Sequence, residues 1–304
     1  MNNTDFTICK ANQEQRDYVF ERVKIKDDDE RNNAIVYVAT DSDNQIIGRI
    51  VIKEKDVPSS IPGKYWYISN LFVHPEFRRK GIAAALVTEI KKQAEISKIV
   101  YLFGSSNPSV EASMFWLNQG FTMNAYGKRQ EDNNKPLFFG NYSHMFSYCI
   151  RRKSLIADHT INNIKRASTD DIQQVIDKYA STDQRKEFFM NKLKDLFGFL
   201  AIGDDGDIQG VIVAYPDSMQ PPLDGTRLWI NAFVEPECRN HGIGQSLVYE
   251  IYRYAKENGI IQLTNTDGAG DDIGFWYEIG FDIFFWDMNS KTGKRATTAM
   301  IRVK

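Results

Sequence analysis

Short runs of β-branched and aromatic residues alternate along the chain with stretches whose apolar residues fall three or four positions apart. This alternation predicts strands interleaved with amphipathic helices. In the first half, the expected strands cover residues 6–10, 35–40, 46–53, 65–74 and 99–104. One helix is expected from Asn12 to about Val23, because Asn12 and Gln15 can close a helix start reciprocally, and another over residues 82–97.

The second half of the chain repeats this order of elements. Strands are expected at Ile164 and over residues 208–215, 227–235 and 260–264, with one helix starting at Ser168 or Thr169 and another after Gly244. Asp205-Gly206 predicts a hairpin turn. A proline-containing interruption occupies the same place in both halves, at residues 57–63 and 216–226.

Two landmarks recur at nearly the same separation. The turn that contains Gly81 returns around Gly242, and 242 − 81 = 161 positions separate these glycines. An aromatic signature, Phe-Trp followed by Gly-Phe, contains Gly120 and returns around Gly280, so that 280 − 120 = 160 positions separate the copies. Repeated landmarks predict an internal duplication. We expect two domains, at residues 1–150 and 160–304, joined by a polar linker.

Composition adds several exclusions. The net charge of −2 and the pI of about 6.1 argue against a surface that follows nucleic acid or anionic lipid. Residues 1–10 lack the layout of a secretory signal, and no apolar run approaches bilayer length, so a cytoplasmic protein is expected. Cys9, Cys149 and Cys238 are widely scattered, which predicts reduced thiols and no metal site.

The glycine turn is the first candidate for chemistry. A glycine between a strand and a helix lets the backbone approach a ligand, and the unpaired amides of the first helical turn then point toward it. The helix dipole adds attraction for an anion. Arg78, Arg79 and Lys80 precede Gly81, so this turn suits a pyrophosphate, whereas the Walker pattern of nucleotide hydrolases is absent.

In these segments the sequence resembles the GNAT superfamily of acyl-CoA-dependent N-acetyltransferases. The matching residues are 71–83, Leu-Phe-Val-His-Pro-Glu-Phe-Arg-Arg-Lys-Gly-Ile-Ala, and 232–244, Ala-Phe-Val-Glu-Pro-Glu-Cys-Arg-Asn-His-Gly-Ile-Gly. Both fit the family's Arg/Gln-x-x-Gly-x-Gly/Ala pattern, with a valine and a proline at the usual distances before it. The resemblance implies an α/β (α+β) fold of two tandem domains, each a mixed, mostly antiparallel sheet flanked by helices.

The resemblance also implies a cofactor, acetyl-CoA, and its binding residues. Turn amides would hold the coenzyme A pyrophosphate, and the preceding strand backbone would pair with the pantetheine arm. In the first copy these residues are Leu71, Phe72, Val73, Arg78, Arg79, Lys80, Gly81, Ile82, Ala83 and Ala84; in the second they are Ala232, Phe233, Val234, Arg239, Asn240, His241, Gly242, Ile243, Gly244 and Gln245. The implied acceptor is a primary amine of a small molecule or peptide.

The sequence departs from the family pattern at its proton-transfer residues. The tyrosine that normally protonates the departing thiolate is replaced by Trp116 and Trp276, and an indole cannot serve as that acid. A carboxylate is also missing from its common place on the central strand in both copies. Catalytic residues are therefore not assigned, and a protein that binds acyl-CoA without turnover, as a sensor or interaction partner, stays as the alternative.

The two copies are not expected to bind coenzyme A equally. Arg79-Lys80 carries more positive charge than Asn240-His241, which favours the first copy. Gly244 argues the other way, because it permits a closer backbone approach than Ala83. The residues expected near the acceptor are Ser105, Ser106, Asn107, Asp267, Asp271 and Asp272, which are helix caps or catalytic groups, and the segment Tyr126–Asn141.

Overall fold

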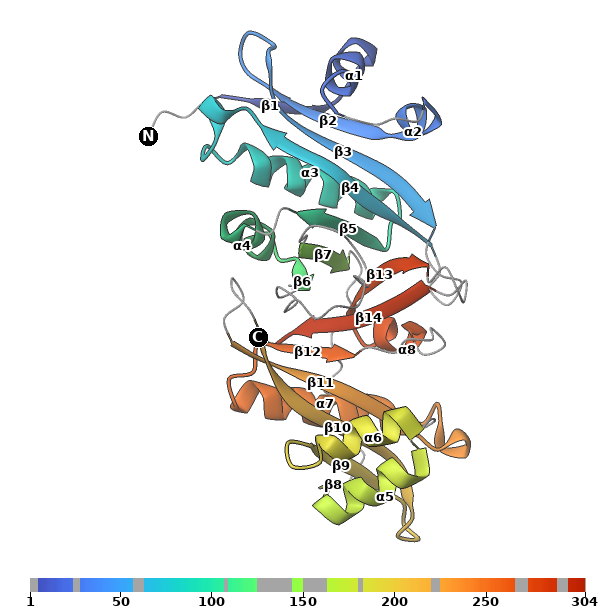
Figure 1. Ribbon diagram of the computed structural model, residues 1–304. Coiled ribbons are helices and arrows are strands. Elements are labelled where there is room, and N and C mark those ends of the chain that lie inside the picture. The colour runs from blue at the N-terminus through green and yellow to red at the C-terminus, as the bar shows by residue number, and fades with distance from the viewer. Residues whose placement is uncertain are drawn as a thin grey trace. The chain divides into compact units, whose positions relative to one another are not determined.

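The structure is a computed structural model that describes residues 5–23, 28–56, 63–106, 109–124, 144–149, 163–179, 183–219, 225–265, 273–288 and 295–303. The chain forms two compact units, the first containing the described residues up to 149 and the second those from 163 onward (Figure 1). Residues 151–162 of the linker expected at Arg151–Asn163, and the segment Tyr126–Asn141, lie outside the described residues. The exact domain limits stay a prediction.

The first unit is a seven-stranded sheet with the order β1-β2-β3-β4-β5-β7-β6. The strands are β1 (Thr7–Lys10), β2 (Ile35–Thr40), β3 (Ile46–Asp56), β4 (Lys64–Val73), β5 (Tyr101–Ser106), β6 (Thr122–Asn124) and β7 (His144–Cys149). The helices are α1 (Gln13–Phe20), α2 (Asp28–Asn33), the 3-10 turn η1 (Pro75–Phe77), α3 (Ile82–Ile96) and α4 (Val110–Asn118). Only β4 and β5 run parallel; the other neighbouring strands of this described sheet are antiparallel.

The second unit has the same topology, with the strand order β13-β14-β12-β11-β10-β9-β8. Its strands are β8 (Ile164–Arg166), β9 (Phe197–Ile202), β10 (Ile208–Met219), β11 (Gly225–Val234), β12 (Gln262–Asn265), β13 (Asp282–Met288) and β14 (Arg295–Arg302). Its helices are α5 (Thr169–Tyr179), α6 (Asp183–Asn191), η2 (Pro236–Cys238), α7 (Ile243–Glu257) and α8 (Ile273–Glu278). The β11–β12 pair is parallel. The predicted fold class is therefore confirmed.

Side chains at the first helix of each unit set its start. In the first unit the Asn12 amide donates to Gln15 Oε1 at 3.0 Å, and the Gln15 amide donates to Asn12 Oδ1 at 2.9 Å. In the second unit the Asp171 amide donates to Ser168 Oγ at 3.1 Å, and the Ser168 amide donates to Asp171 Oδ2 at 2.9 Å. The reciprocal caps confirm both predicted helix starts.

One predicted interruption was wrong. Residues 216–219 continue strand β10, although the sequence analysis assigned them to a proline-rich connection. Pro216 pairs with Leu228 of β11, whereas the pairing of β10 with β9 ends at Ala214. Because β10 has a neighbour on one side only at this point, it is an edge strand there, and edge strands tolerate proline.

Two glycines let the central helix of each unit lie close to its sheet. A Cβ atom at Gly48 of β3 would lie 2.9 Å from Ile82 Cγ2, and one at Gly210 of β10 would lie 2.9 Å from Ile243 Cγ2. Ile82 and Ile243 are the first residues of α3 and α7. The sequence analysis missed these glycines, although their spacing, 210 − 48 = 162, repeats the separation of the landmarks.

The substitution Gly48→Ala is expected to destabilise the first unit by about 1–3 kcal/mol, because the added methyl overpacks a closed contact. Thermal unfolding followed by circular dichroism checks this, with Lys92→Ala on the exposed side of α3 as the control. Gly210→Ala should lower the unfolding temperature of the second unit in the same way. Wild-type unfolding of Gly48→Ala would contradict the close packing of α3.

Different helices cover the two faces of the sheet in the first unit. In the first unit, Val51 belongs to a core cluster with Val19 and Phe20 of α1, whereas Gly48 faces α3. Residues an odd number apart on a strand point to opposite faces, so α1 and α3 cover opposite faces of the sheet. Among the described residues, no helix combines the length and apolar content needed to cross a bilayer.

Candidate functional site

In both units the two central parallel strands separate near their carboxyl ends. The pairing of β4 with β5 runs from Tyr65 to Ile68 on β4 and stops there, and that of β11 with β12 runs from Arg227 to Trp229. The following residues of β4 and β11 remain paired with β3 and β10 on their other side. Their second edge is therefore available to an extended ligand, as a strand edge is in β-augmentation.

Each open strand leads through a 3-10 turn into a left-handed turn and a long helix. Gly81 has φ +83° and Gly242 has φ +82°, and the non-glycine residues Arg79 and Asn240 also have positive φ values, of +62° and +64°. The Ala85 amide donates to Gly81 O at 2.9 Å, which is the first hydrogen bond of the α3 ladder. The amides of residues 82–84 precede it and have no acceptor within the helix. This arrangement is typical of helix N-termini that bind anions.

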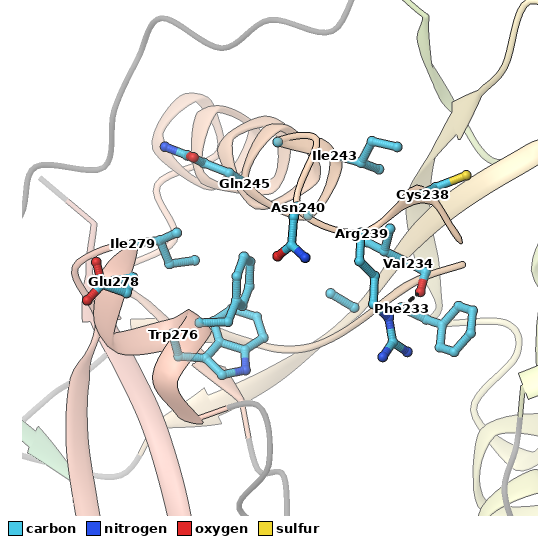
Figure 2. A pocket seen from close by; sticks show the side chains of 14 residues that line it. Phe233, Val234, Cys238, Arg239, Asn240, Ile243, Gln245, Trp276, Glu278 and Ile279 are labelled. Atoms are coloured by element: carbon cyan, nitrogen blue, oxygen red, sulfur yellow. Dashed lines mark hydrogen bonds between the residues drawn. The ribbon is translucent and has the colours of Figure 1, made fainter. Parts of the chain in front are cut away.

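A cavity lies at this junction in each unit. It measures about 1100 Å³ in the first unit and about 510 Å³ in the second. Of the predicted coenzyme residues, the first cavity is lined by Leu71, Phe72, Val73, Arg78, Arg79, Gly81, Ile82, Ala83 and Ala84. The second is lined by Ala232, Phe233, Val234, Arg239, Asn240, Gly242, Ile243, Gly244 and Gln245 (Figure 2).

Lys80 and His241 are the predicted residues that do not belong to these linings. Each directly precedes the turn glycine and is exposed. The Lys80 Nζ lies 4.9 Å from the centre of the Phe77 ring, a cation–π contact. Their assignment to coenzyme binding stays a prediction.

The first arginine of each turn has a structural contact. Arg78 Nε donates to Val73 O at 3.2 Å, and Arg239 Nε donates to Val234 O at 3.1 Å, as the dashed line in Figure 2 marks. Each arginine thereby ties the last carbonyl of the central strand to the turn. In the same view the Asn240 side chain points into the space between the start of α7 and Trp276. The second turn thus places a neutral amide in its cavity.

Arg79 forms an ion pair across the first cavity. Its Nη2 lies 3.1 Å from Glu111 Oε1, in the first turn of α4, and both side chains are exposed. A carboxylate at this position competes with an anionic ligand for the guanidinium.

Glu111→Gln is expected to strengthen the binding of acetyl-CoA by about two- to fivefold, because an exposed pair contributes roughly 0–1 kcal/mol and its removal frees Arg79 for the ligand. Isothermal titration calorimetry at low and high salt measures the change, and Glu95→Gln on the outer side of α3 is the control. Unchanged affinity at low salt would show that Arg79 does not reach the ligand.

An aromatic side chain packs over Gly244 in the second cavity. A Cβ atom at Gly244 would lie 3.2 Å from Cζ of Phe275, so the aromatic ring occupies the space that the missing side chain leaves. The expectation of closer ligand approach at Gly244 stays a prediction, and the sequence alone does not show that Phe275 packs over this glycine. The first unit keeps Ala83 and the larger cavity.

The central strands of the two units differ by one residue. Along β3–β4 the register shifts between Val51↔Asn70 and Ile52↔Ile68, so Ser69 is an extra residue that forms a β-bulge. The Ser69 hydroxyl donates to Val51 O at 3.1 Å. The β10–β11 register, by contrast, is continuous from Gly210↔Val234 to Met219↔Gly225. The second unit therefore lacks the bulge.

The sequence contains a signal for this bulge, although the bulge was not among the predictions. Gly63 and Gly225 open the two central strands and are 225 − 63 = 162 positions apart, whereas Gly81 and Gly242 are 161 apart. The offset changes by one within the strand, which is what a one-residue insertion in the first copy produces.

The repeated aromatic signature has a packing role. Trp116 and Trp276 are 5% and 2% exposed, and each makes edge-to-face contacts with the phenylalanine before it and the one after the glycine. Each indole thus fixes α4 or α8 to the following strand, as expected. Both also line their cavities.

The polar residues at the end of β5 have distinct roles. The α4 cap is Ser109, whose Oγ accepts from the Ala112 amide at 3.2 Å. Ser105 Oγ shares a 3.3 Å hydrogen bond with the Tyr67 hydroxyl. Ser106 Oγ is buried beside the first cavity and has no hydrogen-bond partner in the described part of the chain. Neither Ser105 nor Ser106 is therefore a helix cap; Asn107, Asp267, Asp271 and Asp272 lie outside the described residues.

The second unit closes the gap between its central strands with a side chain. Asn265, at the end of β12, is 1% exposed, and its Nδ2 donates to Ile230 O at 3.0 Å. In the first unit the corresponding residue of β5 is Gly104, which pairs directly with Ile68. The Asn265 amide group of the second unit thus occupies a place where the first unit has a direct backbone pair between β4 and β5.

Comparison with known proteins agrees with this architecture. The model of the acetyltransferase (GNAT) family matches residues 3–121 and again residues 164–281. The chain belongs to the GNAT acetyltransferase family and carries its domain twice. No curated protein matches the sequence significantly.

Several solved GNAT structures are similar to one unit at a time. They include a GNAT acetyltransferase from Elizabethkingia anophelis with acetyl-CoA bound (17% identity, 49% of this chain, 99% of that chain, TM-score 0.36). NAA60 from Arabidopsis thaliana in complex with acetyl-CoA (16%, 48%, 99%, 0.37) and a GNAT acetyltransferase from Staphylococcus aureus Mu50 (15%, 48%, 100%, 0.36) are also among them.

Proposed function

We propose that the first unit transfers an acetyl group from acetyl-CoA to a primary amine. When bound, acetyl-CoA supplies the acyl group activated as a thioester. The amine nitrogen forms a bond to the acyl carbon as the carbon–sulfur bond breaks; the nitrogen loses one proton and the leaving sulfur gains one. The protein's part is to hold the two reactants together and to stabilise the charge that develops on the acyl oxygen.

The first cavity fits such a donor. First-turn amides of α3, together with Arg79, match the charge and hydrogen-bonding needs of a diphosphate. The open edge of residues 71–73 matches the amide groups of a pantetheine arm. The volume of about 1100 Å³ and the lining from both β4 and α4 support a ligand of this length.

The bulge at Ser69 is the observation that carries the assignment to the first unit. It lies one residue past the last β4–β5 pair, Ile68↔Gly104, so main-chain groups there lack partners on β5 as well as a regular partner on β3. An amide freed at this point can donate to the acyl oxygen as negative charge develops on it. The supporting hydrogen bond from the Ser69 hydroxyl to Val51 O keeps the bulge in place.

The proton for the leaving sulfur needs another source than the family's tyrosine, because Trp116 stands at that position. Ser106 supports the proposal, since this residue lines the first cavity and its buried hydroxyl has no hydrogen-bond partner in the described part of the chain. It can donate a hydrogen bond to a sulfur or to a water that exchanges protons with solvent.

We assign no transfer reaction to the second unit. Its central strand has no bulge, its strand gap holds Asn265, and its cavity is about half as large. It retains the left-handed turn and the helix amides, which supports coenzyme binding or a purely structural role. The alternative for the whole chain, an acyl-CoA-binding sensor, is favoured by one observation, the tryptophan at the acid position of both copies.

Thiol release from acetyl-CoA across a panel of primary amines separates these functions. The proposal expects release that is stimulated by at least one amine, with the N-acetylated product identified by mass spectrometry. Calorimetric binding of acetyl-CoA without stimulated release on any amine would instead support the sensor. Absence of any binding would leave only a structural duplication.

A further inference from the structure

A buried arginine distinguishes the first unit from the second. Arg49 lies on β3 directly opposite Phe72 of β4 and is only 9% exposed. Its Nε donates to Asn70 Oδ1 at 3.1 Å, and its guanidinium carbon lies 4.4 Å from the centre of the Phe72 ring. These contacts engage one edge and one face of the guanidinium. The two Nη groups make no hydrogen bond or ion pair within the described part of the chain.

Such a charge is expensive to bury without a counter-ion. A buried cation is normally matched by a carboxylate, because the lost hydration costs several kcal/mol. Burial accordingly lowers the pKa of Arg49 below the ordinary arginine value. No described side chain of the protein therefore neutralises the charge that Arg49 carries at this buried position.

Arg49 faces a small cavity rather than solid protein. The cavity measures about 290 Å³ and is lined by Tyr18, Arg22, Ile46, Ile47, Gly48, Arg49, Phe72 and His74. Arg22 adds a second guanidinium, held 3.7 Å from the centre of the Tyr18 ring. Among its described lining residues there is no carboxylate. Arg22 is ion-paired with the exposed Glu21 at 3.1 Å, so Arg49 is the guanidinium of this lining that no described carboxylate neutralises.

The matching place in the second unit is closed and neutral. Val211 pairs with Phe233 as Arg49 pairs with Phe72, and Val211 belongs to an apolar cluster with residues of α5. Glu235, which corresponds to His74, is neutralised by Lys178 Nζ at 2.5 Å. The same fold can thus fill this position with core side chains, so the arginine and its cavity are not demanded by the architecture.

Arg49 lies close to the proposed transfer site. Phe72 lines both the small cavity and the large one, and Asn70, which binds Arg49, also lines the large one. Asn70 follows the bulge residue Ser69, so the guanidinium lies within about two strand residues, roughly 7 Å, of the bulge. The Arg49 side chain lies on the sheet face covered by α1, because Arg49 and Val51 share that face. The large cavity, in contrast, begins at α3.

We infer that Arg49 binds a carboxylate of the acceptor, so that the substrate is an amino acid-like amine whose nitrogen and carboxylate are separated by only a few bonds. The inference rests on the proposed transfer function and narrows its acceptor. A guanidinium binds a carboxylate through two parallel N–H donors, and both free Nη groups are available for this. The carboxylate would neutralise the buried charge while the amine reaches the acyl group beside Ser69.

Matched amines test this inference. Wild-type protein is expected to acetylate glycine, β-alanine and γ-aminobutyrate with kcat/KM about 10- to 100-fold above their neutral carboxamides, after correction for the fraction of neutral amine. Arg49→Met should remove this preference, and Arg49→Lys should restore part of it, because a lysine keeps the charge without the fork. Lys92→Met, an exposed change on α3, should keep the wild-type ratio.

A binding measurement keeps the inference testable without turnover. Calorimetry should detect N-acetyl-β-alanine binding to wild-type protein, with a Kd at least tenfold lower than that of its carboxamide, and no such difference for Arg49→Met. Turnover of amines with no carboxylate preference, or a preference that survives in Arg49→Met, would overturn the inference and leave the transfer function standing. Carboxylate binding without turnover would support the inference about Arg49 and overturn the transfer function.

Thermal unfolding distinguishes ligand binding from a merely structural role. Because Arg49 carries an unneutralised buried charge, Arg49→Met is expected to unfold at the wild-type temperature or above it. A lower unfolding temperature combined with an unchanged acceptor preference would assign Arg49 to stability and overturn the inference.

Discussion

Deleting Ser69 is expected to lower kcat by about 10²- to 10³-fold, the usual effect of removing one donor to a developing oxyanion. The deletion gives Gly63 and Gly81 the spacing of Gly225 and Gly242, between which the pairing of β11 with its neighbour is regular, so the first unit should still fold. The turn at Gly81 and the open edge of residues 71–73 remain, so the Kd for acetyl-CoA should change by only a few-fold. Steady-state kinetics and calorimetry on the same preparation measure both quantities.

Ser69→Ala is the matched control for this deletion. It keeps the extra residue and removes only the hydrogen bond from the Ser69 hydroxyl to Val51 O, so its loss of kcat should stay below about tenfold. If the deletion variant kept the wild-type kcat, the bulge would have no part in catalysis. If it lost acetyl-CoA binding as well, the bulge would shape the coenzyme site instead.

Gly81→Val is expected to raise the Kd for acetyl-CoA roughly 10- to 100-fold, the loss of one or two charge-assisted hydrogen bonds. The φ value of +83° at Gly81 lies in the left-handed region, which a β-branched side chain avoids. A Cβ atom there would meet nothing within 4 Å, so the effect comes from the backbone and not from a clash. The turn would relax toward negative φ and direct its amides away from the ligand.

Gly242→Val provides an unusually close control for this change, because Gly242 has a φ value of +82° and equally open surroundings. It should cause the same local strain in the second unit and leave transfer activity at the wild-type level. Calorimetry would also give the number of binding sites before and after each change. Loss of activity only on changing Gly242 would show that the assignment of transfer to the first unit is wrong.

Because the chain carries the domain twice, each unit can be compared with the other. The units share strand order, turn geometry and aromatic packing, so features present in only one of them are not required by the fold. The Ser69 bulge and Arg49 are of this kind in the first unit; Asn265 and the Lys178–Glu235 pair are of this kind in the second. This contrast supports one transfer site with a specific acceptor and one copy that has lost it.

The sequence by itself determined the two copies, the strands β1–β5, β8 and β10–β12, and the helices α1, α3, α5 and α7, because these depend on local periodicity and on residues adjacent in the chain. It did not predict β6, β7, β13, β14, α2 or α6. The coenzyme site that it indicates stays a prediction. The left-handed glycines, the capping of α1 and the packing of Trp116 follow from short-range chemistry of this kind. The offset of the repeat even contained the bulge at Ser69, once the two central strands are aligned by their opening glycines.

The tertiary structure alone decided which side chains meet across the sheet. Phe275 over Gly244, Arg78 on the Val73 carbonyl, and Arg49 between Asn70 and Phe72 each depend on strand register or helix packing, which join residues far apart in sequence. In the sequence, Arg49 is one basic residue within a strand. Only the register with β4 and the packing of α1 bury its guanidinium beside a cavity and leave two of its nitrogens without a hydrogen bond in the described part of the chain.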